Sequence, residues 1–375
     1  MQNQISNISP NHPITSSPSE ARLPWLDFAS GIMILWMIVY HAIQASWCYE
    51  VRDLWGITDA SLLPEGIHAF INSDGKLEVL NPCVVFPWLH FFMPWFFYKS
   101  GQFFKKQCTE ELWKKDSKKL IKTFVIWSLV SYVFFLVFGW LNNSLTFRSA
   151  TYSVVRALFL RGFIPINCPL WFLLTLFGVR FVANQLLPKR DDNNVCLKIV
   201  ALVLTSYVVS YLTFRFNHRL LPYWIANGTS GLCFFMLGYA LRDWEKKWWV
   251  ILTSVSICLV SYIIDCPAIV DMFNNSLLLG KYLLWIPISL SCIISFNFIC
   301  RVFNKHARVR IIENIGCNAM TILVTHCLIY ATISQILSHL TINLPYLIVL
   351  GIIVFSYIII LPICCFLKNK IFTKV

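Results

Sequence analysis

The sequence predicts an all-α, polytopic integral membrane protein with about ten transmembrane helices. Of the 375 residues, 57% are hydrophobic and only 13% are charged, whereas soluble domains carry roughly 25% charged residues. The chain also contains repeated apolar runs of about 20 residues, the length that crosses a bilayer as a helix. Short segments rich in Lys and Arg separate these runs.

The first span, residues 23–47, carries an acid near one end and a histidine near the other. On a helix, Asp27, Gly31, Ile34, Ile38 and His41 share one face, and Asp27 and His41 are roughly 21 Å apart along the axis. Ionisable groups inside a membrane helix are costly, so they indicate a functional site. We therefore expect this stripe to line a polar channel in which His41 is the reactive group.

Structural roles for the same residues stay open at this point. His41 could pack the first helix against a neighbour, and Asp27 could cap the helix or pair with Lys99. Arg180 could extend along its helix to the membrane interface.

The other apolar runs follow in order along the chain. We expect spans at residues 84–104, 120–141, 169–187, 196–214, 223–241, 248–265, 277–300, 318–337 and 344–367. Residues 151–164 are too few to cross, and their Arg156 and Arg161 favour an interfacial helix.

The chain divides into a short tail and one large domain. Residues 1–20 are rich in Ser, Asn, Pro and Gln, which predicts a disordered cytoplasmic tail. They lack the basic region of a signal peptide, so the first span should be retained. Residues 21–375 form a single transmembrane domain with an outer loop at 48–83. Cys48 and Cys83 flank that loop and could form a disulfide in an oxidising compartment.

The basic residues set the expected orientation. Of the 31 Lys and Arg residues, 21 lie in segments on the side of the N-terminus, 8 lie on the opposite side, and Lys99 and Arg180 lie within spans. The positive-inside rule therefore places both termini in the cytoplasm. The same distribution accounts for the net charge of +13 without a nucleic-acid partner.

This orientation sorts the intramembrane polar groups into two layers. Asp27, Lys99 and Arg180 fall in the inner half, whereas His41 and His90 fall in the outer part and His326 near the middle of its span.

Four segments, in chain order, resemble the acyltransferase-3 family of integral membrane acyltransferases. They are R-x4-D-x3-G-x9-H from Arg22 to His41, the run M-P-W-F-F-Y-K-S-G ending at Gly101, P-L-W-F-L from Pro169, and I-G-C-N-A-M-T-I-L-V-T-H ending at His326. Within this family the chain is most similar to bacterial sugar and polysaccharide O-acetyltransferases.

The resemblance implies transfer of an acetyl group from acetyl-CoA to a hydroxyl of a cell-surface glycan or its lipid-linked precursor, at the bacterial cytoplasmic membrane. It also implies that the helix-1 histidine, His41, is essential. Acetyl-CoA would be a co-substrate, with no permanently bound cofactor and no metal. The oligomeric state stays unknown.

The chain departs from the family pattern in three ways. Ser30 stands where many members carry a cation, and Lys99 is the candidate replacement. Phe92 stands where members often carry His, with His90 nearby. Lysines replace paired arginines before the third span, at Lys115, Lys118 and Lys119, and lysine lacks the bidentate fork of arginine.

The residue types suit O-acylation. An imidazole such as that of His41 can take the hydroxyl proton as a base or accept the acetyl group as a nucleophile. We assign His41 and Asp27 to catalysis. We assign donor binding to Lys99, Arg180, Lys115, Lys118 and Lys119, and acceptor or supporting roles to Trp171, Arg161 and His326. Cationic side chains suit the phosphates of CoA.

Two other classes of function stay open. A transporter of a sugar or lipid-linked intermediate would also place ionisable groups in its spans. A structural partner in a polysaccharide-assembly complex would need none of them.

Overall fold

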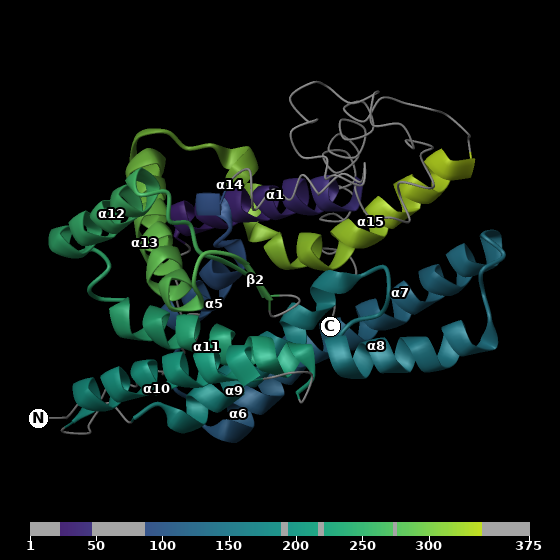
Figure 1. The fold of residues 1–375 in the computed structure, drawn as a ribbon, viewed down its shortest axis with the longest axis horizontal. Coiled ribbons are helices and arrows are strands. Elements are labelled where there is room, and N and C mark those ends of the chain that lie inside the picture. Colours follow the sequence, from purple (N-terminus) through teal and green to yellow (C-terminus); the bar gives the residue numbers. More distant parts are fainter. Residues whose placement is uncertain (1–22, 47–86, 189–193, 217–220, 273–275, 340–375) are drawn as a thin grey trace, which may run out of the picture.

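The computed structural model describes residues 23–46, 87–188, 194–216, 221–272 and 276–339. These residues are helical apart from connections and one two-stranded hairpin (Figure 1). The helices are α1 Pro24–Ser46, η2 Pro87–Leu89, α5 Phe92–Gln102, α6 Thr109–Asp116, η3 Ser117–Ile121, α7 Lys122–Leu141, η4 Ser149–Ser153, α8 Val154–Arg161, η5 Cys168–Leu170, α9 Trp171–Leu186, α10 Val195–Phe216, α11 Tyr223–Leu241, α12 Trp248–Ile263, α13 Tyr282–His306, α14 Arg310–Cys317 and α15 Ala319–His339, and the strands are β1 Ile269–Asp271 and β2 Ser276–Leu279. The predicted all-α class is confirmed.

Four helices of the described residues are long and apolar enough to cross a membrane: Thr109–Leu141, Cys168–Leu186, Val195–Phe216 and Tyr282–His306. A fifth span results if α14 and the first part of α15, which are bent by 82°, count as one broken crossing. The exposed side chains of such helices include several leucines, for example Leu129, Leu204 and Leu212. Outward-facing apolar side chains on long helices are typical of a membrane protein.

Most predicted spans match observed helices closely. The expected spans 169–187, 196–214, 223–241 and 318–337 correspond to α9, α10, α11 and α15. The expected short helix within 151–164 is present as α8. The span at 344–367, the tail at 1–20, the loop at 48–83 and the pair Cys48 and Cys83 lie outside the described residues.

The span expected at 84–104 was wrong in its extent. Helix α5 has 11 residues, which gives roughly 16 Å at 1.5 Å per residue, about half of a bilayer core. Pro94 lies in its first turn, where proline is tolerated, but it cannot lie in a helix interior without breaking a hydrogen bond. The helix therefore begins at Phe92 rather than near residue 84.

The span expected at 277–300 starts later than predicted. Residues 276–279 form β2, which pairs antiparallel with β1, and α13 begins only at Tyr282. Gly280 turns the chain between them with a φ of 68°, a conformation that favours glycine. The hairpin packs inward, since Ile269, Val270 and Met272 are buried.

The basic run Lys105–Lys122, which leads into the third predicted span, is mostly helical. Helix α6 begins at Thr109 and continues through the π-helical turn η3 into α7. The two lysines of η3, Lys118 and Lys119, therefore have fixed positions on a helix rather than on a loop.

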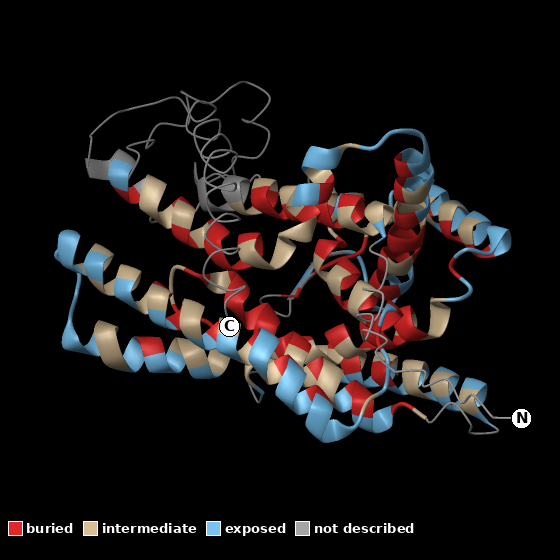
Figure 2. Cartoon of the chain, turned by 180° about the vertical axis from the view of Figure 1, so that it is seen from behind, coloured by how far each residue is buried: buried red, intermediate tan, exposed pale blue. Residues whose placement is uncertain are grey.

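Two glycine crossings hold the centre of the fold together. A Cβ on Gly31 would lie 2.1 Å from the carbonyl oxygen of Ile312, and a Cβ on Gly316 would lie 1.8 Å from that of Asp27. Helices α1 and α14 therefore cross in backbone contact. Gly101 of α5 and Gly238 of α11 make the second crossing in the same way. Buried residues gather around these crossings, whereas α7, α8 and α10 contain few buried residues (Figure 2).

Candidate functional site

A cavity of about 760 Å³ lies between α1, α5, α9 and the α14–α15 break. Its basic lining residues are Lys99, Lys105, Lys119, Arg180 and Arg242, and Asp27 is the acid among its described lining residues. The remaining wall is mainly apolar, with Phe96 and Phe172 among its members. Such a cavity suits a ligand with several negative charges and a less polar portion.

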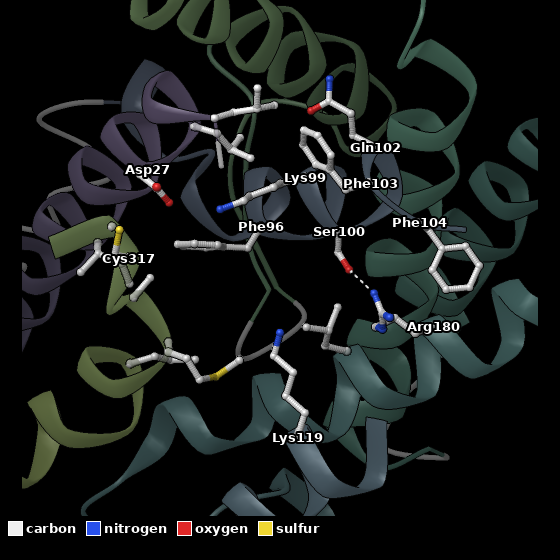
Figure 3. A pocket seen from close by; sticks show the side chains of 18 of the residues that line it. Asp27, Phe96, Lys99, Ser100, Gln102, Phe103, Phe104, Lys119, Arg180 and Cys317 are labelled. Atoms are coloured by element: carbon white, nitrogen blue, oxygen red, sulfur yellow. Dashed lines mark hydrogen bonds between the residues drawn. The ribbon is translucent and has the colours of Figure 1, made fainter. Parts of the chain in front are cut away.

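Lys99 lies beside Ser30, the position where relatives carry a cation. The Lys99 ammonium donates to the Ser30 hydroxyl at 2.5 Å, and that hydroxyl donates to the Leu26 carbonyl at 2.5 Å. The ammonium also lies 5.1 Å from the centre of the Trp95 ring. Figure 3 shows the Lys99 and Asp27 side chains pointing toward one another across the cavity. Lys99 thus occupies the region that a cation at position 30 would reach.

Arg180 is held in place by a carboxylate that the sequence analysis did not assign. Its Nε donates to Asp116 at 2.7 Å and its Nη2 donates to the other Asp116 oxygen at 3.3 Å. A third nitrogen donates to the Ser100 hydroxyl at 3.2 Å (Figure 3). Bidentate pairing fixes the plane of a guanidinium. The signal in the sequence was one aspartate within a lysine-rich run.

His41, near the C-terminal end of α1, lies beside His326 in the first half of α15. Their ring centres are 5.2 Å apart, and the Tyr330 hydroxyl donates to the His41 carbonyl at 3.3 Å. Tyr40 lies between His41 and His90, with ring centres 5.3 Å from each. His326 is buried and its Nδ1 lies 3.0 Å from the Ile322 carbonyl. A carbonyl only accepts, so this contact places the His326 proton on Nδ1 and leaves Nε2 as an acceptor.

The cavity and the histidine pair share the same two helices. Asp27 packs at Gly316, and His41 packs at His326 and Tyr330, so α1 and α15 run side by side in the same direction (Figure 1). Ile34 and Leu323 line the cavity. Ile34 lies two helical turns before His41, and Leu323 lies one turn before His326. The cationic cavity therefore ends just below the histidines.

The other predicted site residues lie elsewhere. Lys115 and Lys118 are exposed and are not among the residues that line the cavity. Trp171 is buried at the start of α9, in edge contact with Phe172. Arg161 lines a second cavity, described below. Within the described ranges no group of three or more His, Cys, Asp or Glu side chains could hold a metal ion.

Glu245 is a further buried carboxylate close to the cavity. It is 1% exposed and accepts from Tyr98 at 2.8 Å, Gln102 at 2.5 Å and Asn297 at 3.2 Å, and it pairs with Arg301. These donors come from α5 and α13, and Gln102 itself lines the cavity. Burying an acid is costly unless it is fully hydrogen-bonded. Glu245 therefore fixes the cavity end of α5 against α13.

A family model described as an acyltransferase domain, that of the acyltransferase-3 family, matches residues 23–367. The chain belongs to this family of acyltransferases. No curated protein matches the chain. No solved structure matches it either.

Proposed function

We propose that the protein is a membrane-bound O-acetyltransferase that moves an acetyl group from acetyl-CoA to a hydroxyl of a cell-surface polysaccharide or a lipid-linked sugar precursor. One observation carries this proposal: a cavity lined by five cations ends below a pair of histidines on the same two helices. The protein would act in the bacterial cytoplasmic membrane, with the cationic cavity facing the cytoplasm.

The donor would enter from the cationic end. CoA carries phosphate groups at one end and a thioester at the end of a long arm, and guanidinium and ammonium groups bind phosphates through charge-assisted hydrogen bonds. Lys99, Lys119 and Arg180 would hold the phosphates together with Lys105 and Arg242. The arm would extend along Ile34 and Leu323 toward the histidines.

The chemistry would take place at His41. In a direct transfer, the imidazole takes the proton of the acceptor hydroxyl while its oxygen attacks the thioester carbonyl, and CoA leaves as the thiol after protonation. In a two-step transfer, the His41 imidazole attacks the thioester carbonyl and takes the acetyl group as CoA leaves as the thiol; the acceptor hydroxyl then attacks the acetyl-imidazole, loses its proton and releases His41. The acceptor nitrogen of His326 could orient His41 or take up a proton in either route. Asp27 would act at the donor end, about four helical turns from His41.

The acceptor would approach from the histidine end. Replacement of His41 by alanine should abolish transfer of radiolabelled acetyl from acetyl-CoA to membrane glycan, without loss of expression. His306→Ala is the matched control, since His306 is exposed at the end of α13. Full transfer by His41→Ala would contradict the catalytic assignment.

The same preparation also tests the rival class. Purified protein that hydrolyses or transfers the acetyl of acetyl-CoA supports the enzyme. Substrate flux that is independent of acetyl-CoA, together with no such chemistry, would support a transporter instead.

A further inference from the structure

A second cavity, of about 420 Å³, lies between α8 and the start of α11. Its lining residues are Ser153, Arg156, Ala157, Leu160, Arg161 and Tyr223. The Arg161 guanidinium lies 5.8 Å from the centre of the Tyr223 ring. Two guanidinium groups on one small cavity favour an anionic group, and its volume falls within the usual range of small-molecule sites, roughly 300–1,000 Å³.

The helix that lines this cavity has three distinct faces. Ser153, Arg156 and Arg161 belong to the cavity face. Val154 is buried, and Leu158 packs against the core beside it. Residues spaced by three and four lie on one stripe of a helix, and the third stripe is apolar and exposed: Tyr152, Val155 and Phe159. The carbonyl of Phe159 accepts from the Trp224 indole at 3.0 Å, which holds the helix against α11.

The two cavities lie at opposite ends of α11. Tyr223, the first residue of α11, lines the smaller cavity, and Arg242, the residue after its last, lines the larger one. Nineteen residues separate them, which is about 28 Å of helix and close to the thickness of a bilayer core. A ligand of the smaller cavity would therefore meet the protein at the membrane surface opposite the donor cavity.

We propose that the smaller cavity binds the phosphate-containing head of a lipid-like amphiphile. Arg156 and Arg161 would hold the phosphate or diphosphate, and the apolar tail would lie along Val155 and Phe159 in the membrane. A free polar anion would not contact the apolar stripe, and an uncharged lipid would not pair with the two guanidinium groups. That the amphiphile carries the acceptor sugar rests on the function proposed above.

Binding to the full-length protein in phosphatidylcholine nanodiscs tests the site directly. The probe is a fluorescent isoprenyl diphosphate. The double variant Arg156→Gln, Arg161→Gln should weaken binding at least tenfold, and the lysine pair at the same positions should retain part of it. Arg148→Gln is the matched control, because Arg148 lies 5.9 Å from the Tyr152 ring but does not line the cavity. It should bind as the wild type does.

Competitors separate the possible sources of the phosphate. The uncharged isoprenol and inorganic diphosphate should each compete poorly, since each lacks one half of the amphiphile. Unchanged binding by the glutamine pair, or equal competition by either half, would overturn the site. Equal competition by phosphatidylglycerol would identify a bulk lipid headgroup and overturn the acceptor-carrier role. Acetyl-CoA binding should be the same in these variants as in the wild type. If the wild type does not bind acetyl-CoA, that result would count against the proposed function alone and not against the lipid site.

Discussion

At the scale of single residues, Lys99 shows how the structure replaces one cation by another. Its ammonium reaches the hydroxyl of Ser30 from α5, so the charge enters the cavity from a different helix than in relatives that carry a cation at position 30. The fold thus allows α5 to place a positive charge beside position 30 of α1.

Replacement of Lys99 by alanine should raise the KM for acetyl-CoA about tenfold with a smaller effect on kcat. A lost charge-assisted hydrogen bond is worth about 1.5–3 kcal/mol, and 1.4 kcal/mol corresponds to a factor of ten. Addition of Ser30→Lys to that variant should recover part of the affinity, because the new ammonium reaches the same space. Steady-state transfer rates measure both effects.

Lys115→Ala serves as the control for Lys99, since Lys115 is exposed and does not line the cavity. An equal rise in KM for both variants would mean that net positive charge, rather than the position of Lys99, sets donor affinity.

At the scale of helices, the crossing of α1 and α14 positions both parts of the site. Gly31 and Gly316 bring the two backbones together beside Asp27, and α15 continues from this point to His326. The crossing therefore fixes the register that places His41 against His326.

Alanine at Gly31 or at Gly316 should destabilise the protein and reduce transfer. The added Cβ meets backbone atoms about 2 Å away, at 2.1 Å and 1.8 Å, and backbone cannot rotate aside as a side chain can. Overpacking of this kind costs about 1–3 kcal/mol or more. Thermal unfolding in detergent measures the change. Gly178→Ala is the matched control on α9, because its added Cβ would meet nothing within 4 Å. A normal unfolding temperature and normal transfer in Gly31→Ala would show that the crossing can open at little cost.

At the scale of the whole molecule, the two cavities give the protein two chemically different ends. One end gathers five cations, and the other presents two arginines on a helix with an apolar exposed stripe. A transferase that takes its donor from one side and its acceptor from the other needs such a difference.

An impermeant amine-reactive reagent tests the orientation on intact cells, using natural lysines. Lys281 is exposed at the start of α13, and Lys115 and Lys118 are exposed near the cationic cavity. The orientation expected from the basic residues predicts that Lys281 is labelled on intact cells, whereas Lys115 and Lys118 are labelled only after lysis. Peptide mass spectrometry identifies the labelled sites. Labelling of Lys115 in intact cells would reverse the orientation and place the donor cavity on the wrong side for CoA.

The sequence by itself determined the features that depend on local hydrophobicity. The long apolar runs at α9, α10 and α11 predicted these helices within a few residues. The backbone N–H and C=O groups of such a run must hydrogen-bond to one another, so the run forms a helix wherever it packs. The motifs around His41, Met93 and His326 placed the chain in its family. The resemblance also named Lys99 as the candidate replacement for a cation at Ser30.

Only the tertiary structure decided which side chains share one site. Asp116 and Glu245 looked like ordinary acids in basic segments, yet one orients Arg180 and the other is buried among donors from two helices. Lys119 lines the larger cavity and its neighbour Lys118 does not, because successive residues of a helix point in different directions. The physical reason is that hydropathy reports the preference of a segment for lipid or water. A site forms instead from contacts between residues far apart in the chain, and only the close packing of the helices determines these contacts.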